Sequence, residues 1–205
     1  MGSEMFIRDR TPLDSAAELY SIVDSLSWDS FCAGFRHFGY TFEAFREAVI
    51  ATSVVPSDVY RKSCKNATDL IQLYPSAIDL LEGLHSGSGF PMIVTCGSST
   101  IWRELLDKHG CKEIPVFGGS HADVDAFLIG KNEKGMLANF FKANGHPVIA
   151  IGDSETDVPL FKTIKNNIAV SNSTENLKQL AKIITTKKSG EGVLEGLDMI
   201  ASDLR

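Results

Sequence analysis

Val148-Ile-Ala-Ile-Gly-Asp-Ser-Glu-Thr-Asp157 is an apolar run that leads directly into a Gly-Asp turn, with a second aspartate four residues after the first. A short apolar run of this kind is typical of a parallel strand that is buried on both faces. The carboxyl ends of such strands face the crevice in which open α/β sheets bind ligands. We therefore expect Asp153 and Asp157 to lie at the rim of a binding site.

Two ionised carboxylates on one tight loop repel each other unless a positive charge lies between them. Magnesium fits this loop best, because Mg²⁺ prefers one or two carboxylates together with water and phosphate oxygens. The alternative is that Asp157 only caps the next helix, since Val158-Pro159 follows and proline favours a first helical turn. The loop taken alone is compatible with a metal site and with a helix cap.

The composition of the 205 residues excludes several classes of protein. The net charge is −6 and no basic stripe occurs, so we expect no nucleic-acid partner. No apolar run approaches the ~18 residues that a membrane helix needs, and the N-terminus has no signal peptide. The cysteines have no zinc-binding spacing and are expected to be reduced thiols of a cytoplasmic protein: Cys32, Cys64, Cys96 and Cys111.

The order of predicted elements indicates an α/β fold. Residues 13–74 have helical patterning without a convincing strand, and they have the character of an inserted cap. From Pro75 onward helices and strands alternate, which favours a parallel sheet with right-handed crossovers. The predicted helices cover residues 76–85, 99–109, 134–143 and 191–200, and the predicted strands cover 91–95, 114–117, 148–151 and 167–170.

Thr95-Cys96-Gly97-Ser98 lies between a predicted strand and a predicted helix. The free N–H groups and the dipole at a helix N-terminus favour an anion such as phosphate. The alternative is structural, with Thr95 ending the strand and Ser98 or Ser99 capping the helix. A cysteine phosphatase loop is disfavoured, because six residues separate Cys96 from Arg103 where five are needed.

Lys134 begins the predicted helix 134–143, whose buried stripe is expected to be Met136, Leu137, Phe140 and Phe141. A lysine in a first helical turn opposes the helix dipole unless it meets a phosphate or a carboxylate. A solvated surface lysine is the alternative, and Lys131 competes for the same role. Lys134 is favoured because its helix leads into the strand that ends at Asp153.

These three elements, in this order, resemble the haloacid dehalogenase superfamily of phosphohydrolases, and within it the phosphoserine phosphatase-like branch. The resemblance implies that Thr95, Cys96 and Gly97 bind phosphate, that Lys134 binds it and neutralises charge in catalysis, and that Asp153 and Asp157 hold Mg²⁺. It implies a three-layer Rossmann-like parallel sheet, formed by residues 1–14 and 75–205. A helical cap, residues 15–74, is then inserted after the first strand.

The resemblance also implies phosphoryl transfer to an aspartate followed by hydrolysis, with a second aspartate two residues later as the acid and base. The superfamily carries both in an N-terminal strand of pattern D-x-D-x-T. The best match here is Ile7-Arg-Asp-Arg-Thr11, which aligns Asp9 with the acid and base but puts Ile7 in place of the nucleophile. Only Met5-Phe-Ile7 is apolar enough for a buried strand.

Three explanations account for this departure: a truncated or artificially joined N-terminus, a degenerate relative without catalysis, and a mistaken family assignment. The first is preferred, because the loss of a whole strand would damage the fold as well as the chemistry while the other motifs are intact.

The leading hypothesis is a Mg²⁺-dependent phosphatase that acts on a small phosphorylated metabolite through an aspartyl-phosphate. The second is a catalytically inactive relative that binds phosphate or a metal. A phospho-accepting receiver domain fits less well, because receivers have no helical insert. His121-Ala-Asp-Val-Asp125 is expected to be a loop or hairpin. No role is assigned to the basic residues of the cap, which are Arg36, His37, Arg46, Arg61 and Lys62.

Overall fold

The computed structural model of the protein describes residues 7–9, 50, 53–73, 75–87, 89–119 and 129–203. In this part of the chain, helices and strands alternate from Pro75 onward, as the sequence predicts. No helix in the described ranges is both long enough and apolar enough to pass through a membrane.

The elements follow one another along the chain as β1 (Ile7–Asp9), α4 (Ser57–Leu70), β2 (Ile71–Leu73), α5 (Pro75–Ser86), β3 (Ile93–Ser98), α6 (Ser99–Lys108), β4 (Val116–Gly119), α7 (Lys131–Ala143), β5 (Ala150–Gly152), η1 (Glu155–Asp157), α8 (Val158–Thr163), β6 (Asn167–Ala169), α9 (Glu175–Lys178), β7 (Ile183–Ile184) and α10 (Ser189–Asp203).

Two groups of parallel strands form the centre of the fold. Strand β3 pairs with β4, and β5, β6 and β7 form a second group in that order. Their residues are mostly buried, and the three residues of β6 are all inaccessible to solvent. Parallel strands buried on both faces are the arrangement expected of an α/β protein. The prediction of an α/β fold is therefore confirmed.

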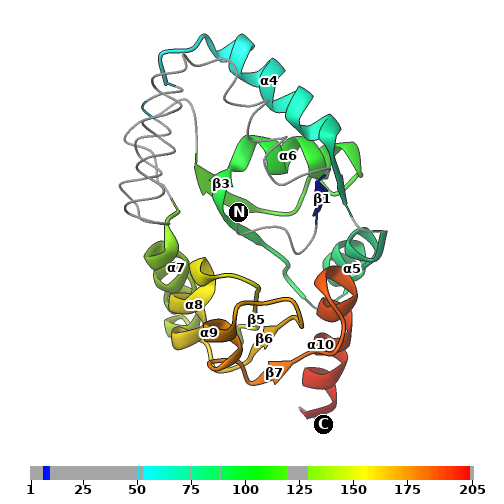
Figure 1. Ribbon diagram of the computed structural model, residues 1–205, viewed down its shortest axis with the longest axis vertical. Coiled ribbons are helices and arrows are strands. Elements are labelled where there is room, and N and C mark those ends of the chain that lie inside the picture. The colour runs from blue at the N-terminus through cyan, green and yellow to red at the C-terminus, as the bar shows by residue number, and fades with distance from the viewer. Residues whose placement is uncertain are drawn as a thin grey trace.

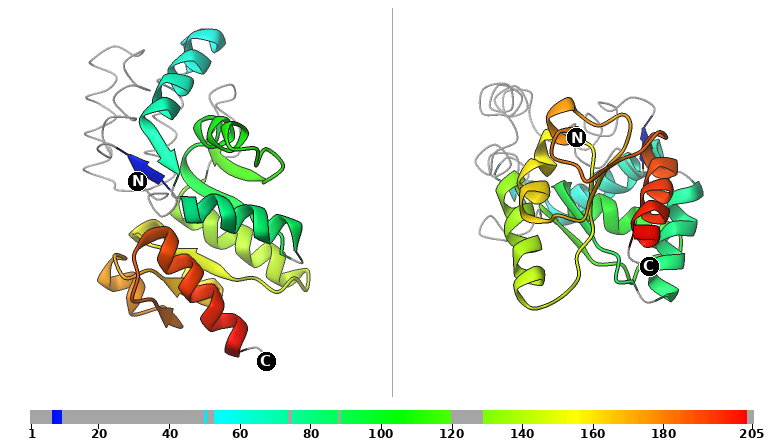
Figure 2. Two further views of the ribbon diagram at one scale, coloured as in Figure 1. Left: turned by 90° about the vertical axis from the view of Figure 1, so that its right-hand side faces the viewer. Right: turned by 90° about the horizontal axis from the view of Figure 1, so that it is seen from below.

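Helices cover both faces of the second strand group. Figure 1 shows α7 and α8 on one side of β5, β6 and β7, with α10 and α5 on the other side, and the right-hand view of Figure 2 shows the same order. One apolar cluster joins Phe161 and Leu177 to Ala169 of β6, and another joins Val193 of α10 to Leu80 of α5. This is a three-layer, Rossmann-like arrangement.

The first strand differs from the expectation. Strand β1 pairs antiparallel with β2, with Ile7 opposite Leu73. The prediction that residues 13–74 contain no strand is wrong at β2, because a three-residue strand is too short to produce a periodic pattern. The pairing places residues 7–9, which precede the predicted cap, beside residues 71–73 near its end.

Several predictions fall outside the part of the chain that the structure describes. Residues 10–49 hold most of the predicted cap, including Arg36, His37 and Arg46. The segment from His121 to Asp125 is also outside the described ranges. These predictions stay expectations.

The predicted apolar stripe of α7 is wrong at Met136 and Phe140, whereas Leu137 and Phe141 are partly buried. Met136 and Phe140 are 68% and 61% exposed, whereas Lys134, Gly135 and Ala138 form the buried face of the helix. A Cβ on Gly135 would lie only 3.0 Å from the Pro159 carbonyl oxygen, so the small residues allow α8 to pack closely. Close helix packing decides the orientation here, against the apolar pattern.

We expect Phe161→Ala to lower the free energy of unfolding by about 3–5 kcal/mol, because it empties a position that is 3% exposed in the core. The matched variant Phe140→Ala removes the same ring from the exposed side of α7 and is expected to cost below ~1 kcal/mol. Denaturant unfolding measures both. Equal losses would show that the exposed assignment of Phe140 is wrong.

Candidate active site

A buried ion pair lies at the centre of the site. The Lys134 ammonium donates to Oδ1 of Asp157 at 2.7 Å, and the side chains are 1% and 4% exposed. Lys134 comes from the first turns of α7, and Asp157 ends the short helix η1 that follows β5. The predicted choice of Lys134 over Lys131 agrees with this burial, since Lys131 is partly exposed.

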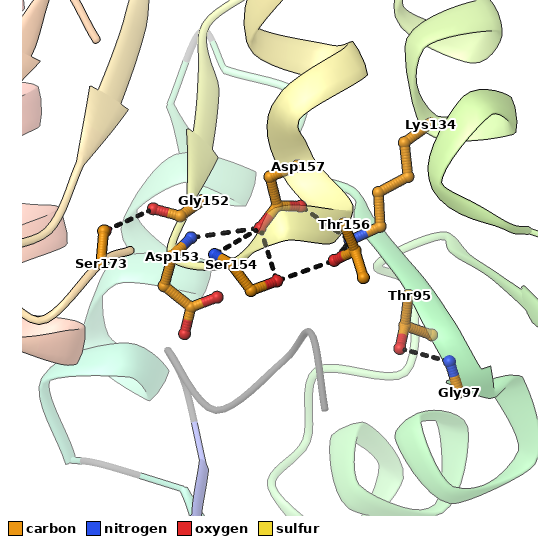
Figure 3. Close-up of polar contacts among 9 residues, drawn as sticks. All are labelled: Thr95, Gly97, Lys134, Gly152, Asp153, Ser154, Thr156, Asp157 and Ser173. Atoms are coloured by element: carbon orange, nitrogen blue, oxygen red, sulfur yellow. Dashed lines mark hydrogen bonds and ion pairs between the residues drawn. The ribbon is translucent and has the colours of Figure 1, made fainter. Parts of the chain in front are cut away.

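The second oxygen of Asp157 holds the loop after β5. Oδ2 accepts hydrogen bonds from the backbone N–H groups of Asp153 at 3.1 Å and Ser154 at 3.2 Å (Figure 3). The Asp157 side chain makes no capping bond to α8. The interpretation of Asp157 as a cap of the following helix is therefore wrong, because its carboxylate points back to the loop instead.

Gly152 makes this loop geometry possible. A Cβ at position 152 would lie 2.6 Å from the Asp157 Cβ and 2.8 Å from Oδ2. Any larger residue would push the carboxylate away from the amides that it binds. The glycine before Asp153 is therefore required by close packing, which the sequence analysis did not recognise.

Two hydroxyl groups extend the network beyond the ion pair. Lys134 also donates to Thr156 Oγ1 at 3.2 Å, and that hydroxyl lies 2.8 Å from the Ser154 hydroxyl. Thr156 is fully buried. The sequence analysis missed both residues, although their place between the two aspartates was the available signal.

The surroundings of Lys134 favour its charged form. Burial opposes the charge, but the carboxylate of Asp157 in particular, helped by Cys96 and Asp153, outweighs it and raises the pKa of Lys134 above its ordinary value. Lys134 therefore supplies a fixed positive charge at neutral pH.

Cys96 lies close enough to interact with this charge. Burial raises the pKa of the Cys96 thiol, although the Lys134 ammonium and the Thr156 hydroxyl favour the thiolate. A neutral thiol is a poor nucleophile. This agrees with the sequence argument against a cysteine phosphatase.

Thr95 is the third residue of β3, so the prediction that the strand ends at Thr95 is wrong: the strand continues to Ser98, with an irregularity between Val94 and Ser98. Thr95 is 1% exposed, and its Oγ1 accepts a hydrogen bond from the Gly97 N–H at 3.0 Å. A Cβ on Gly118 of β4 would lie 2.7 Å from the Thr95 methyl carbon, so a glycine is needed there. The last residues of β3 are thus fixed by the hydrogen bond between Gly97 and Thr95 and by the close approach of Gly118.

The Asp153 carboxylate points away from Asp157 in Figure 3, and the residue is 9% exposed. Its influence on the pKa of Lys134 places it within electrostatic range of the ammonium. The structure brings Thr95, Lys134 and the two aspartates into one region. In the described ranges, no group of three or more histidine, cysteine or carboxylate side chains could hold a metal ion.

Asp9, the predicted acid and base, lies on β1, and its backbone pairs with Ile71. The role assigned to its side chain stays a prediction.

Comparison with known proteins identifies the family. A model of the haloacid dehalogenase-like hydrolases matches residues 6–162, and a second model with the same description matches residues 134–197. The chain belongs to the haloacid dehalogenase-like hydrolase family. The first match runs from β1 through the Asp153 loop, so it includes every predicted site residue of this family member.

The chain is also similar to proteins named phosphoglycolate phosphatase. It is 46% identical over 61 residues to that of Nitrosopumilus maritimus (strain SCM1), covering 30% of this chain and 26% of the relative. It is 44% identical over 98 residues to that of Archaeoglobus fulgidus (strain ATCC 49558), covering 48% and 44%. The family member thus spans about a quarter to a half of the length of these relatives.

The fold of this family member resembles solved structures. Phosphoserine phosphatase in its apo form superposes with a TM-score of 0.61 at 18% identity, covering 89% of this chain and 90% of that one. At this identity the likeness shows the fold alone. It agrees with the three-layer arrangement described above.

We expect Asp157→Asn to lower the free energy of unfolding by about 3–5 kcal/mol, because it leaves the Lys134 ammonium buried without a counter-charge. The double variant Lys134→Met/Asp157→Asn removes that charge and should regain part of the loss. Denaturant unfolding measures all variants. Glu175→Gln breaks an ion pair whose carboxylate side chain is 84% exposed, and it should cost below ~1 kcal/mol.

If the double variant is no more stable than Asp157→Asn, the unpaired lysine is not the cause of the loss.

The raised pKa of Lys134 sets a pH dependence. A folded-state pKa above the unfolded value gives stability that is complete below the unfolded pKa and is lost as pH rises through the folded pKa. We expect the stability difference between wild type and the double variant Lys134→Met/Asp157→Asn, which leaves neither charge unpaired, to be constant from about pH 6 to pH 9 and to shrink only in more alkaline solution. A difference that changes within the neutral range would contradict the assignment.

Proposed function

We propose that this chain is a metal-dependent phosphatase that acts on a small phosphomonoester. The observation that carries the proposal is the buried Lys134 ammonium, held by Asp157 beside the ends of β3 and β5. A fixed positive charge at the ends of parallel strands suits an anionic ligand. The family supports hydrolysis as the chemistry.

The phosphoryl group would lie between the end of β3 and Lys134. The Thr95 hydroxyl, the Cys96 N–H and the Lys134 ammonium would bind its oxygens, and Gly97 would orient the Thr95 hydroxyl, to which its N–H donates. Donors that are already held in place stabilise charge without reorganising during the reaction. The hydrogen bond from Gly97 to Thr95 and the ion pair of Lys134 supply this rigidity.

A divalent metal fits the carboxylates of the loop. Asp153 and Asp157 bring two carboxylates to one loop beside a single buried ammonium, that of Lys134. Oxygen ligands favour a hard ion, so we expect Mg²⁺ to be held by Asp153, with Asp157 as the second carboxylate. When bound, the metal supplies positive charge to the phosphoryl oxygens.

The reaction requires a carboxylate nucleophile. Its oxygen forms a bond to phosphorus while the bond from phosphorus to the ester oxygen breaks, and the leaving oxygen takes a proton from the acid, here Asp9. Water, deprotonated by the Asp9 carboxylate, then attacks phosphorus while the bond from phosphorus to the nucleophile's oxygen breaks, and phosphate leaves. Ile7 stands at the nucleophile position, so this chain requires a carboxylate there to follow the route.

A second candidate is a member of the family that binds phosphate without turnover. It is favoured by Ile7 and by the antiparallel pairing of β1 with β2. In contrast, β3 pairs parallel with β4, and β5 pairs parallel with β6. The two candidates share the binding site and differ only in the chemical step.

The relatives suggest the first substrate to test. They are named phosphoglycolate phosphatase, so 2-phosphoglycolate joins a generic aryl phosphate as a test substrate. We propose a cytoplasmic location, since the cysteines that the structure describes are free and buried thiols: Cys64, Cys96 and Cys111.

We expect the Ile7→Asp chain to hydrolyse p-nitrophenyl phosphate or 2-phosphoglycolate in the presence of Mg²⁺. In that background Asp153→Asn should lower turnover by about a hundredfold or more, because it removes a metal ligand. The matched variant Glu155→Gln alters an exposed carboxylate of the same loop and should change turnover by less than roughly twofold. A colorimetric phosphate assay measures each rate.

Unchanged turnover in Asp153→Asn would exclude the proposed metal site. Phosphate binding without any turnover, even after Ile7→Asp, would favour the second candidate, whereas turnover by the unaltered chain would reject it.

A further inference from the structure

A buried polar contact joins the helix α4 to the start of α6. The Tyr60 hydroxyl lies 3.0 Å from the Ser98 hydroxyl, and Tyr60 is 6% exposed. The thiol of Cys64, which is fully buried, interacts with both hydroxyls. This cluster lies where α4 packs on α6, near the upper end of the molecule in Figure 1.

Ser98 occupies the position from which a serine normally caps a helix. It directly precedes Ser99, the first residue of α6, and its backbone is extended with φ −67° and ψ 121°. In this conformation a serine hydroxyl accepts a hydrogen bond from an N–H group of the first turn. Ser98 makes no such bond in the part of the chain that the structure describes.

The neighbouring serine is engaged elsewhere as well. The Ser99 hydroxyl donates to the Gly119 carbonyl at 2.8 Å. The two serine hydroxyls at this end of α6 therefore contact Tyr60 and β4. Neither satisfies the N–H groups of the first turn, which are the groups that bind anions at a helix N-terminus.

This helix end belongs to the proposed phosphate site. Ser98 follows Gly97, whose N–H binds Thr95 Oγ1, and Cys96 of the same strand interacts with Lys134. A capping bond from Ser98 would compete with phosphate for the first-turn N–H groups. Such a bond is worth about as much as other serine caps, typically ~1 kcal/mol.

We propose that Tyr60 is a positioning residue for phosphate: by holding the Ser98 hydroxyl, it keeps that hydroxyl from capping α6 and leaves the first-turn N–H groups for phosphate oxygens. The inference rests on the proposed function. Tyr60 comes from the predicted cap segment, so it makes phosphate affinity depend on a residue outside the Rossmann-like core.

The test is a double-mutant cycle on the full chain, with inorganic phosphate as the probe and calorimetry in Mg²⁺ as the readout. Tyr60→Phe keeps the ring and removes the hydroxyl, and we expect it to weaken phosphate binding by about fivefold. Ser98→Ala should not weaken binding, because no competing hydroxyl is left. The double variant should bind like Ser98→Ala, within roughly twofold.

Amide hydrogen exchange gives a second readout that needs no ligand. In Tyr60→Phe the released Ser98 hydroxyl should cap α6, so exchange at the N–H groups of Thr100 and Ile101 should slow relative to wild type. Thr68→Val is the matched control. It removes another buried hydroxyl of α4, which bonds the Cys64 carbonyl at 2.8 Å, and should leave both phosphate affinity and this exchange unchanged.

The outcomes separate the two proposals. If Tyr60→Phe binds phosphate normally, or if the double variant binds as weakly as Tyr60→Phe, Tyr60 does not act through Ser98. Faster exchange at Ile101 in Tyr60→Phe would indicate a merely structural role and would overturn the inference. A wild-type chain that binds no phosphate overturns the proposed function together with this inference.

Discussion

The ion pair between Lys134 and Asp157 is the interaction on which the rest of the site depends. A buried ammonium without a partner costs several kcal/mol, so the lysine can occupy this position only if the carboxylate reaches it. Asp157 reaches it because the bare backbone of Gly152 leaves room for its side chain. The same carboxylate binds the amides of Asp153 and Ser154. One side chain therefore fixes both the charge and the loop.

The position of α7 extends this constraint to both groups of strands. The helix lies in the chain between β4, which pairs with β3, and β5, which pairs with β6. Its small residue Gly135 allows α8 to approach, and this packing turns Lys134 inward while Phe140 faces solvent. The crossover helix α7 thus places the Lys134 ammonium beside both β3 and β5. Family membership agrees with this arrangement, since the region matched by the family model includes β3, α7 and β5.

The N-terminal part of the chain pairs differently from the parallel strands of the core. Strand β1 pairs antiparallel with β2, so residues 7–9 lie beside the last residues before α5. Tyr60, on the helix that leads into β2, contacts Ser98, the last residue of the strand that holds Thr95 and Gly97. Packing of α4 on α6 therefore brings a side chain from this region to the edge of the proposed site.

The sequence alone determined the class of fold and the place of the loop around Asp153. Apolar runs that end in Gly-Asp and a regular alternation of helix and strand are local patterns. Such patterns can be recognised without knowing which segments pack against each other. The choice of Lys134 could also be made from the sequence, because a lysine in a first helical turn is unfavourable unless an anion lies nearby.

Only the tertiary structure decided which oxygen of Asp157 meets which donor, that Thr156 shares the lysine, and which side of α7 is buried. These features depend on contacts between segments that are distant in sequence, where the space left by Gly135 and Gly152 outweighs the apolar pattern of one helix. Close packing acts through shape in three dimensions, and a one-dimensional pattern of residue types does not contain that shape.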